Sequence, residues 1–155
     1  MNKISVMFIC HGNICRSPMA EFIFKQLVQN KGLSHRFIIN SSATSNEEIW
    51  GNVGNPIYPP AKRELEKRGV PFTDHRAIQL KKSDYGLHDY FLVMDSSNYS
   101  NAIRIFGGDP EQKVKKLLSY AGENRDVSDP WYSGDFSTCF NDIEKGVKAF
   151  LQEII

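Results

Sequence analysis

The sequence predicts an α/β protein in which an open parallel sheet is covered by helices on both faces. The chain has 155 residues, the size of one ordinary domain, so we expect a single domain over residues 1–155. Apolar runs of strand length alternate with segments of helical periodicity, an order that is typical of parallel sheets. The first strand and the first helix are joined by a short loop, as at the opening of a βαβ unit.

Each element follows from its local pattern. Residues 4–9 (ISVMFI) form a nearly continuous apolar run, which is typical of a strand buried on both faces. Ser17 is expected as the N-cap and Pro18 as the first residue of a helix that ends at residues 31–32. Residues 114–119 (VKKLLS) fit either a strand or a short helix. Further strands are expected at residues 36–41 and 90–94, and further helices at residues 60–68 and 137–155.

Charge and composition narrow the range of functions. The net charge is +1, and lysines occur in isolated doublets (81–82 and 115–116), so we do not expect a nucleic acid partner. The opening apolar run is too short to span a membrane, and we expect neither a membrane partner nor an export signal. Three cysteines cannot form a complete disulfide framework, so reduced thiols and a cytoplasmic location are expected.

Residues 10–18 (CHGNICRSP) have the pattern of a phosphate-binding loop. Backbone N–H groups of a tight Gly-Asn loop can converge on one anion, and the helix that follows points its positive end to the same place. Arg16 adds a planar donor that suits two phosphate oxygens. In this positive environment we expect Cys10 to be a thiolate, the nucleophile that covalent phosphoryl transfer requires. Ser17 could donate its hydroxyl group to the departing sulfur.

Other interpretations of this loop fit less well. A structural cysteine in an ordinary βα turn would not need the Gly-Asn loop or the Ser-Pro pair that begins a helix. The segment does not end in Gly-Lys-Ser/Thr, so a nucleotide P-loop is not expected. Cys10 and Cys15 do not have Cys-x-x-Cys spacing, and no metal site is expected.

With these residues in place, the chain resembles the low-molecular-weight protein tyrosine phosphatases. That family opens with a strand and the pattern Cys-x-Gly-Asn-x-Cys-Arg-Ser-Pro, which matches residues 10–18. Further family segments occur in order at residues 41–45, 54–56, 75–77, 94–95 and 129–132. The resemblance implies a three-layer α/β/α fold with a four-stranded parallel sheet of order 2-1-3-4, a phosphocysteine intermediate and no cofactor.

The resemblance also implies roles for individual residues. Cys10 is the expected nucleophile, Arg16 the phosphate clamp, and Asp129 the general acid that protonates the leaving phenolate and later activates water. The other residues of the expected phosphate-binding loop are His11, Gly12, Asn13, Ile14, Cys15 and Ser17, and Ser41 and His75 are expected to support it. We expect phosphotyrosine-containing proteins or small aryl phosphates as substrates, inorganic phosphate as product, and a monomer.

Three aromatic residues are candidates for contact with a substrate ring. Trp131 and Tyr132 directly follow the expected general acid, and Trp50 lies between the second strand and the second helix. Residues 46–53 form a longer loop than is usual in the family, and Ile78 stands where relatives often have arginine.

The two other cysteines distinguish further possibilities. Cys15 shares a tight loop with Cys10, so oxidation could join the two in a disulfide that protects Cys10. A thioredoxin-coupled arsenate reductase of the same fold would need two more redox cysteines near the middle of the chain. Residues 76–95 contain none, and Cys139 is expected as a buried structural thiol in a helix.

Two alternatives remain besides arsenate reduction. Protein-arginine phosphatases resemble this chain but usually carry threonine where Ile14 stands and lack the pair formed by Trp131 and Tyr132. A phosphate-binding module without turnover would need neither Cys10 nor Asp129. These observations favour tyrosine phosphatase activity.

Overall fold

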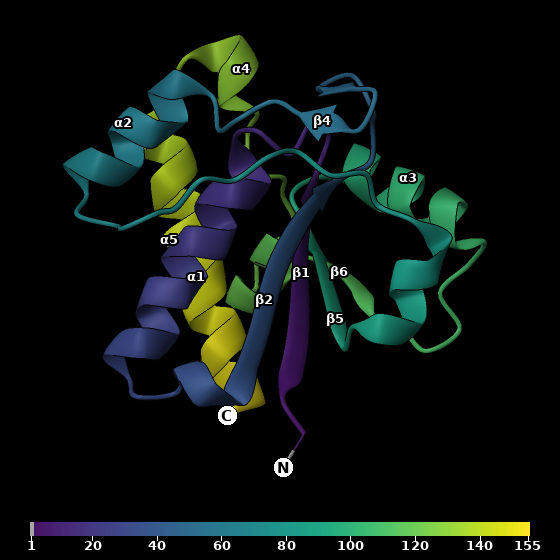
Figure 1. Ribbon diagram of the computed structural model, residues 1–155. Helices are drawn as coiled ribbons and strands as arrows, with labels where there is room; N and C mark the ends of the chain where they lie inside the picture. The colour runs from purple at the N-terminus through teal and green to yellow at the C-terminus, as the bar shows by residue number, and fades with distance from the viewer. Residues whose placement is uncertain (1) are drawn as a thin grey trace.

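Four parallel strands form the centre of the computed structural model, which describes residues 2–155 (Figure 1). In chain order they are β1 (Ile4–Cys10), β2 (Phe37–Ala43), β5 (Tyr90–Val93) and β6 (Val114–Lys116), and their order across the sheet is β2-β1-β5-β6. Every neighbouring pair is parallel. The expected α/β class and the 2-1-3-4 order of the main strands are therefore confirmed.

Helices cover both faces of this sheet (Figure 1). α1 (Arg16–Asn30) and α5 (Phe136–Ile154) pack on one face, and α2 (Pro59–Lys67) packs against these two helices. α3 (Ser96–Phe106) covers the other face together with a 3₁₀ turn at Lys82–Leu87. No helix within residues 2–155 is long and apolar enough to cross a membrane.

The apolar run of β1 is buried on both faces, as its pattern predicts. Val6, Phe8 and Cys10 belong to the core beneath α1 and α5. Met7 and Ile9 belong to the core beneath α3. All five are at most 3% exposed, so burial of these side chains fixes the strand and the position of the cysteine at its end.

The register of the strands brings three loops to one edge of the sheet. Cys10 lies opposite Ala43 at the end of β2, and Ile9 lies opposite Val93 at the end of β5. The loops after β1, β2 and β5 therefore leave from the same edge. Ligands of open parallel sheets bind at this carboxyl edge.

The start of α1 differs from the prediction. The helix begins at Arg16 with Cys15 in the N-cap position, and no side chain caps it. The assignment of Ser17 as N-cap was therefore wrong, because the Ser17 hydroxyl contacts the Cys10 sulfur and the Asn13 side chain instead. The bounds of the other predicted elements shift by one or two residues.

The ambiguous segment 114–119 contains both alternatives. Its first three residues form β6, and a 3₁₀ turn at Leu117–Ala121 follows directly. A second 3₁₀ turn at Ser34–Arg36 precedes β2.

Several elements were not predicted, among them one full helix. α3 follows Asp95, which caps it by accepting a hydrogen bond from the Asn98 N–H (2.7 Å). The long loop 46–53 contributes to a small antiparallel hairpin of β3 (Ile49–Trp50) and β4 (Val53–Gly54). The one-turn helix α4 (Pro130–Ser133) begins directly after Asp129.

Candidate active site

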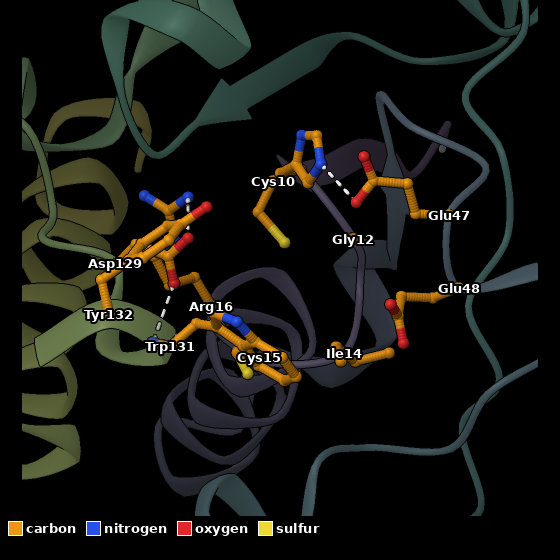
Figure 2. A pocket seen from close by; sticks show the side chains of 11 residues that line it. Cys10, Gly12, Ile14, Cys15, Arg16, Glu47, Glu48, Asp129, Trp131 and Tyr132 are labelled. Carbon is orange, nitrogen blue, oxygen red and sulfur yellow. Dashed lines mark hydrogen bonds and ion pairs between the residues drawn. The ribbon is translucent and has the colours of Figure 1, made fainter. Parts of the chain in front are cut away.

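A cavity of about 340 Å³ opens at the carboxyl edge of the sheet (Figure 2). Its floor consists of residues from the loop after β1, and its walls come from the loop after β2 and from α4. The lining residues are Cys10, His11, Gly12, Ile14, Cys15, Arg16, Glu47, Glu48, Asp129, Trp131 and Tyr132. The structure thus brings together residues that lie up to 122 positions apart in the sequence, from position 10 to position 132.

The sulfur of Cys10 is surrounded by hydrogen-bond donors. The backbone N–H groups of Asn13 and Ser17 point to Sγ at 3.3 and 3.4 Å, and the Ser17 hydroxyl lies 2.9 Å from it. The positive end of α1 lies at the same place, because Ser17 is in the first turn of that helix. Hydrogen bonds of this kind stabilise a sulfur that carries negative charge.

Asn13 holds the loop in shape behind the sulfur. Its backbone φ is +59°, in the left-handed region that asparagine tolerates better than most residues. The fully buried side chain donates from Nδ2 to the hydroxyl oxygens of Ser17 (2.7 Å) and Ser41 (3.0 Å). Its Oδ1 accepts hydrogen bonds from the Ile78 N–H (3.1 Å) and from His75 Nε2 (3.0 Å). One side chain therefore ties the loop to two other segments, β2 and residues 75–78.

Glu21 extends this network, and sequence reasoning missed it. The Ser41 hydroxyl donates to Glu21 Oε1 at 2.6 Å, and His75 Nδ1 lies 3.7 Å from the same oxygen. The second carboxylate oxygen pairs with Lys25 at 2.6 Å. Glu21 is 6% exposed, so the partners compensate a buried charge. A glutamate among apolar positions of a helix was the available signal.

Arg16 is buried beside the sulfur and is held by two carboxylates. Its Nη1 donates to Asp95 Oδ2 (2.9 Å) and to the Val127 carbonyl (2.8 Å), and its Nη2 lies 3.6 Å from Asp129 Oδ2. Burial opposes the charge of the guanidinium, but the proximity of Cys10, Asp95 and Asp129 outweighs it and raises the pKa of Arg16. The guanidinium is therefore a fixed positive charge at the floor of the cavity. Arg16 thus supplies the positive partner of Asp95, while position 78 carries an uncharged isoleucine.

Asp129 is oriented by the helix that follows it. It is the N-cap of α4, and its Oδ1 accepts a hydrogen bond from the Trp131 N–H at 3.0 Å. Its Oδ2 points toward Arg16 (Figure 2). One oxygen thus fixes the side chain, and the other faces the cavity floor.

The aromatic candidates differ in their positions. Trp131 and Tyr132 line the cavity and are 53% and 86% exposed. Trp131 is supported from behind by Tyr58, whose ring centroid is 4.6 Å away. Trp50 is 73% exposed on the β3–β4 hairpin, outside the cavity lining. The structure therefore does not bring Trp50 to the site, because this residue lies on the exposed β3–β4 hairpin, where it pairs with Val53.

Two glutamates at the cavity were not predicted. Glu47 accepts a hydrogen bond from His11 Nε2 at 3.0 Å, and Glu48 lies next to Gly12. An acidic pair shortly after the second strand was the only sequence signal. Its relevance depended on the parallel register, which places the ends of β1 and β2 side by side.

The two remaining cysteines, Cys15 and Cys139, are free thiols with buried side chains. Burial raises the pKa of Cys15 and of Cys139 above that of an ordinary thiol, so both are neutral at physiological pH. Cys139 lies within α5, as predicted. Among residues 2–155, no three His, Cys, Asp or Glu side chains are grouped as metal ligands.

The fold and the loop together define a class, that of small α/β proteins with a Cys-x₅-Arg loop at the carboxyl edge of a parallel sheet. Comparison with known proteins narrows this class. Residues 5–155 match the family model for low molecular weight phosphotyrosine protein phosphatases. The chain therefore belongs to this family and is a low molecular weight protein-tyrosine phosphatase.

Individual relatives resemble the chain over nearly its full length. The low molecular weight phosphotyrosine protein phosphatase of Schizosaccharomyces pombe is 39% identical over 157 residues, which cover 98% of this chain and 97% of the relative. The crystal structure of YfkJ from Bacillus subtilis superposes with a TM-score of 0.93 at 33% identity, covering 99% of this chain and 96% of YfkJ. The structure of a Drosophila arginine phosphatase is also similar, with a TM-score of 0.85, 28% identity and 96% coverage of each chain.

Proposed function

We propose that this phosphatase hydrolyses phosphotyrosine through a phosphocysteine intermediate on Cys10, with Arg16 as the phosphate clamp and Asp129 as the general acid and base. The main support is the environment of the sulfur, where three donors lie within 3.4 Å of Sγ. All three cysteines are buried, but this set of donors surrounds only the Cys10 sulfur among the hydrogen bonds of the described residues, and a structural thiol needs no such donors.

In the first step the Cys10 thiolate attacks phosphorus, and the bond between phosphorus and the phenolic oxygen breaks. The loop N–H groups and Arg16 bind the equatorial oxygens, on which charge is spread in the transition state. Asp129 transfers its proton to the phenolic oxygen as this oxygen leaves. The product of this step is phosphocysteine and a free phenol.

Asp129 suits this role because its two oxygens have separate partners. Oδ1 is held by the Trp131 N–H, which sets the orientation of the carboxyl group. Oδ2 faces Arg16 at 3.6 Å, and a bound phosphate dianion would compete for this guanidinium. Substrate binding would thereby release Oδ2 for contact with the leaving oxygen.

In the second step water attacks phosphorus, and the sulfur–phosphorus bond breaks. Asp129 accepts the proton of the water molecule, which restores the acid for the next cycle. Sulfur leaves as a thiolate that the Ser17 hydroxyl and the two backbone N–H groups stabilise. Inorganic phosphate is released, and the cycle requires no cofactor.

The walls of the cavity favour an aryl phosphate. Trp131 and Tyr132 present aromatic surface next to Asp129, where the leaving group would lie. Ile14 adds an apolar, 7% exposed side chain at the opposite side of the floor. Phosphoarginine is the second candidate, because the Drosophila arginine phosphatase shares this fold. At the cavity floor the apolar Ile14 side chain cannot accept a hydrogen bond from a guanidinium, and the aromatic surface of Trp131 and Tyr132 suits a phenyl ring, so tyrosine is favoured.

The experiment that tests the proposal compares rates on a phosphotyrosine peptide, phosphoarginine and arsenate with one enzyme preparation. We expect the highest kcat/KM for phosphotyrosine. Cys10→Ser should abolish turnover and retain phosphate binding, measured by calorimetry. A Cys10→Ser variant as active as the wild type would refute the covalent mechanism.

A second variant isolates the role of Asp129. Asp129→Ala should lower kcat by about 10²–10⁴-fold on alkyl phosphates, whose leaving groups need a proton. On p-nitrophenyl phosphate the loss should be much smaller, because p-nitrophenolate leaves without one. Equal losses on both substrates would remove Asp129 from the acid role.

We also propose that Cys15 protects the nucleophile from oxidation. Peroxide would oxidise Cys10 to a sulfenic acid, and the Cys15 thiol would condense with it to form a disulfide and water. After peroxide and then dithiothreitol, the wild type should recover more activity than Cys15→Ser. Equal recovery would contradict the proposal.

A further inference from the structure

Two carboxylates line a cavity whose floor is built to hold a phosphate dianion. Glu47 and Glu48 are the residues concerned, and neither contributes to the hydrogen bonds around Cys10 described above. A negative wall near a dianion is unfavourable by itself, because like charges repel. A positively charged group on the substrate would offset this repulsion by pairing with the two carboxylates.

Glu48 is fixed in place by its neighbours. Its Oε1 accepts a hydrogen bond from Asn55 Nδ2 at 3.0 Å, and its carbonyl accepts from the Asn55 N–H at 2.8 Å. Its side chain packs against the backbone of the phosphate-binding loop, since a Cβ at Gly12 would lie 3.2 Å from Glu48 Cγ. The carboxylate is thus positioned beside the loop rather than free in solvent.

Glu47 is tied to the loop from the outside. The His11 carbonyl accepts from the Ser45 N–H (3.0 Å), and Ser45 Oγ in turn accepts from the Glu47 N–H (3.1 Å). His11 Nε2 also donates to Glu47 Oε2 at 3.0 Å. The side chain of Glu47 is still 66% exposed, so its carboxylate remains accessible to a ligand.

These two carboxylates lie across the cavity from Asp129, Trp131 and Tyr132 (Figure 2). The aromatic side would take the phenyl ring of phosphotyrosine. The opposite wall would then face the peptide groups that extend from the ring at the rim of the cavity.

We infer that Glu47 and Glu48 select phosphotyrosine that is flanked by arginine or lysine in the substrate peptide. This inference rests on the proposed function and names the substrate class for the same site. A basic neighbour would pair with the wall, whereas an acidic neighbour would be repelled by it. Exposed pairs of this kind contribute about 0.2–1 kcal/mol each, which corresponds to a factor of up to about five in kcat/KM per carboxylate.

The test compares three phosphotyrosine peptides that differ only in the flanking residues, which are arginine, alanine or glutamate. For the wild type we expect kcat/KM to be about 5–20-fold higher with arginine than with glutamate, and this ratio to fall as salt increases. In Glu47→Gln and in Glu48→Gln the ratio should fall about two- to fivefold, and in the double variant it should approach one. Glu47→Lys should move the ratio toward peptides with glutamate.

A matched control removes the same charge elsewhere. Glu111 lies near Lys3 and Ile4, at the opposite edge of the sheet, so Glu111→Gln should keep the wild-type ratio. Because each ratio compares peptides on one enzyme, a partly unfolded fraction does not affect it.

The failure of this inference differs from the failure of the proposed function. Hydrolysis of all three peptides at similar rates, or an unchanged ratio in the double variant, would overturn the selection and leave the phosphatase mechanism intact. Lack of hydrolysis of every phosphotyrosine peptide and of p-nitrophenyl phosphate would overturn both.

Discussion

Replacement of Asn13 tests whether the phosphate-binding loop is held by the network behind it. In Asn13→Ala the left-handed backbone would cost about 1 kcal/mol, because alanine tolerates this region less well. The Ile78 N–H and His75 Nε2 would lose their acceptor at about 1 kcal/mol each. The hydroxyl groups of Ser17 and Ser41 keep other partners, Cys10 Sγ and Glu21 Oε1. The sum is a loss of about 3 kcal/mol in the free energy of unfolding.

Asn13→Gly separates the two contributions. Glycine adopts the left-handed region freely, so this variant should lose the hydrogen bonds but avoid the backbone strain, at a cost of about 2 kcal/mol. Urea unfolding measures both values, and turnover of p-nitrophenyl phosphate should fall in both variants because the Ser17 hydroxyl loses the hydrogen bond from Asn13 that helps to fix it beside the sulfur. A loss below about 1 kcal/mol in Asn13→Ala, or equal losses in the two variants, would refute this reasoning.

Three further predictions concern packing, the hairpin and thiol reactivity. Gly54→Ala should lower the free energy of unfolding by about 2 kcal/mol or more, because the new Cβ would overlap the backbone carbonyl of Ala77. In the control Gly86→Ala the new Cβ meets no described atom within 4 Å, so the free energy of unfolding should change by less than about 0.5 kcal/mol. Equal effects would contradict the contact. Trp50→Ala should change kcat/KM for p-nitrophenyl phosphate by less than about twofold. A tenfold loss would indicate that Trp50 contacts the substrate. Iodoacetamide at pH 7 should label Cys10 before Cys15, whose pKa is raised by burial; peptide mass spectrometry that found the reverse order would contradict this difference.

The sequence predicted the elements whose burial dominates their pattern. β1 is buried on both faces and reads as a continuous apolar run, and α5 carries a clear apolar stripe. α3 was missed because Ala102 and Phe106 are its only buried apolar side chains, while its first turns are rich in serine and asparagine. Gly107, which ends α3 in the left-handed conformation, is a helix-end signal in the sequence. It was weak evidence because the residues before it show no apolar periodicity of a helix.

The start of α1 shows how a site overrides a local preference. Serine before proline is a favourable N-cap pair, and local reasoning placed the helix start there. In the structure the Ser17 hydroxyl lies 2.9 Å from the Cys10 sulfur and accepts from Asn13, so it is not available as a cap. The N-terminus of α1 therefore has no side-chain cap, and the Ser17 hydroxyl instead contacts the Cys10 sulfur, as the proposed chemistry requires.

Residues of the site that come from other segments were harder to predict. Glu47 and Glu48 gain their meaning from the parallel pairing of β1 with β2, which no local pattern specifies. Glu21 lies on the side of α1 that faces Ser41 and Asn13. Packing in the folded chain sets which side of the helix faces these residues, and no local pattern specifies it. The family resemblance supplied Asp129, since an isolated Asp-Pro pair more often marks an ordinary turn.

The positions of these residues divide the site into a part that is fixed and a part that can vary. Asn13 and Arg16 take their partners from β2, from the segment around residue 78 and from the start of α3, so a change there disturbs loop and core together. Glu47 and Tyr132, by contrast, are 66% and 86% exposed on surface segments. Substitutions at such positions usually cost less than about 0.5 kcal/mol of stability. Substitutions in the loop after β2 and in α4 can therefore change the substrate preference while the loop after β1 keeps the chemistry. Differences in specificity among relatives should concentrate in these two wall segments.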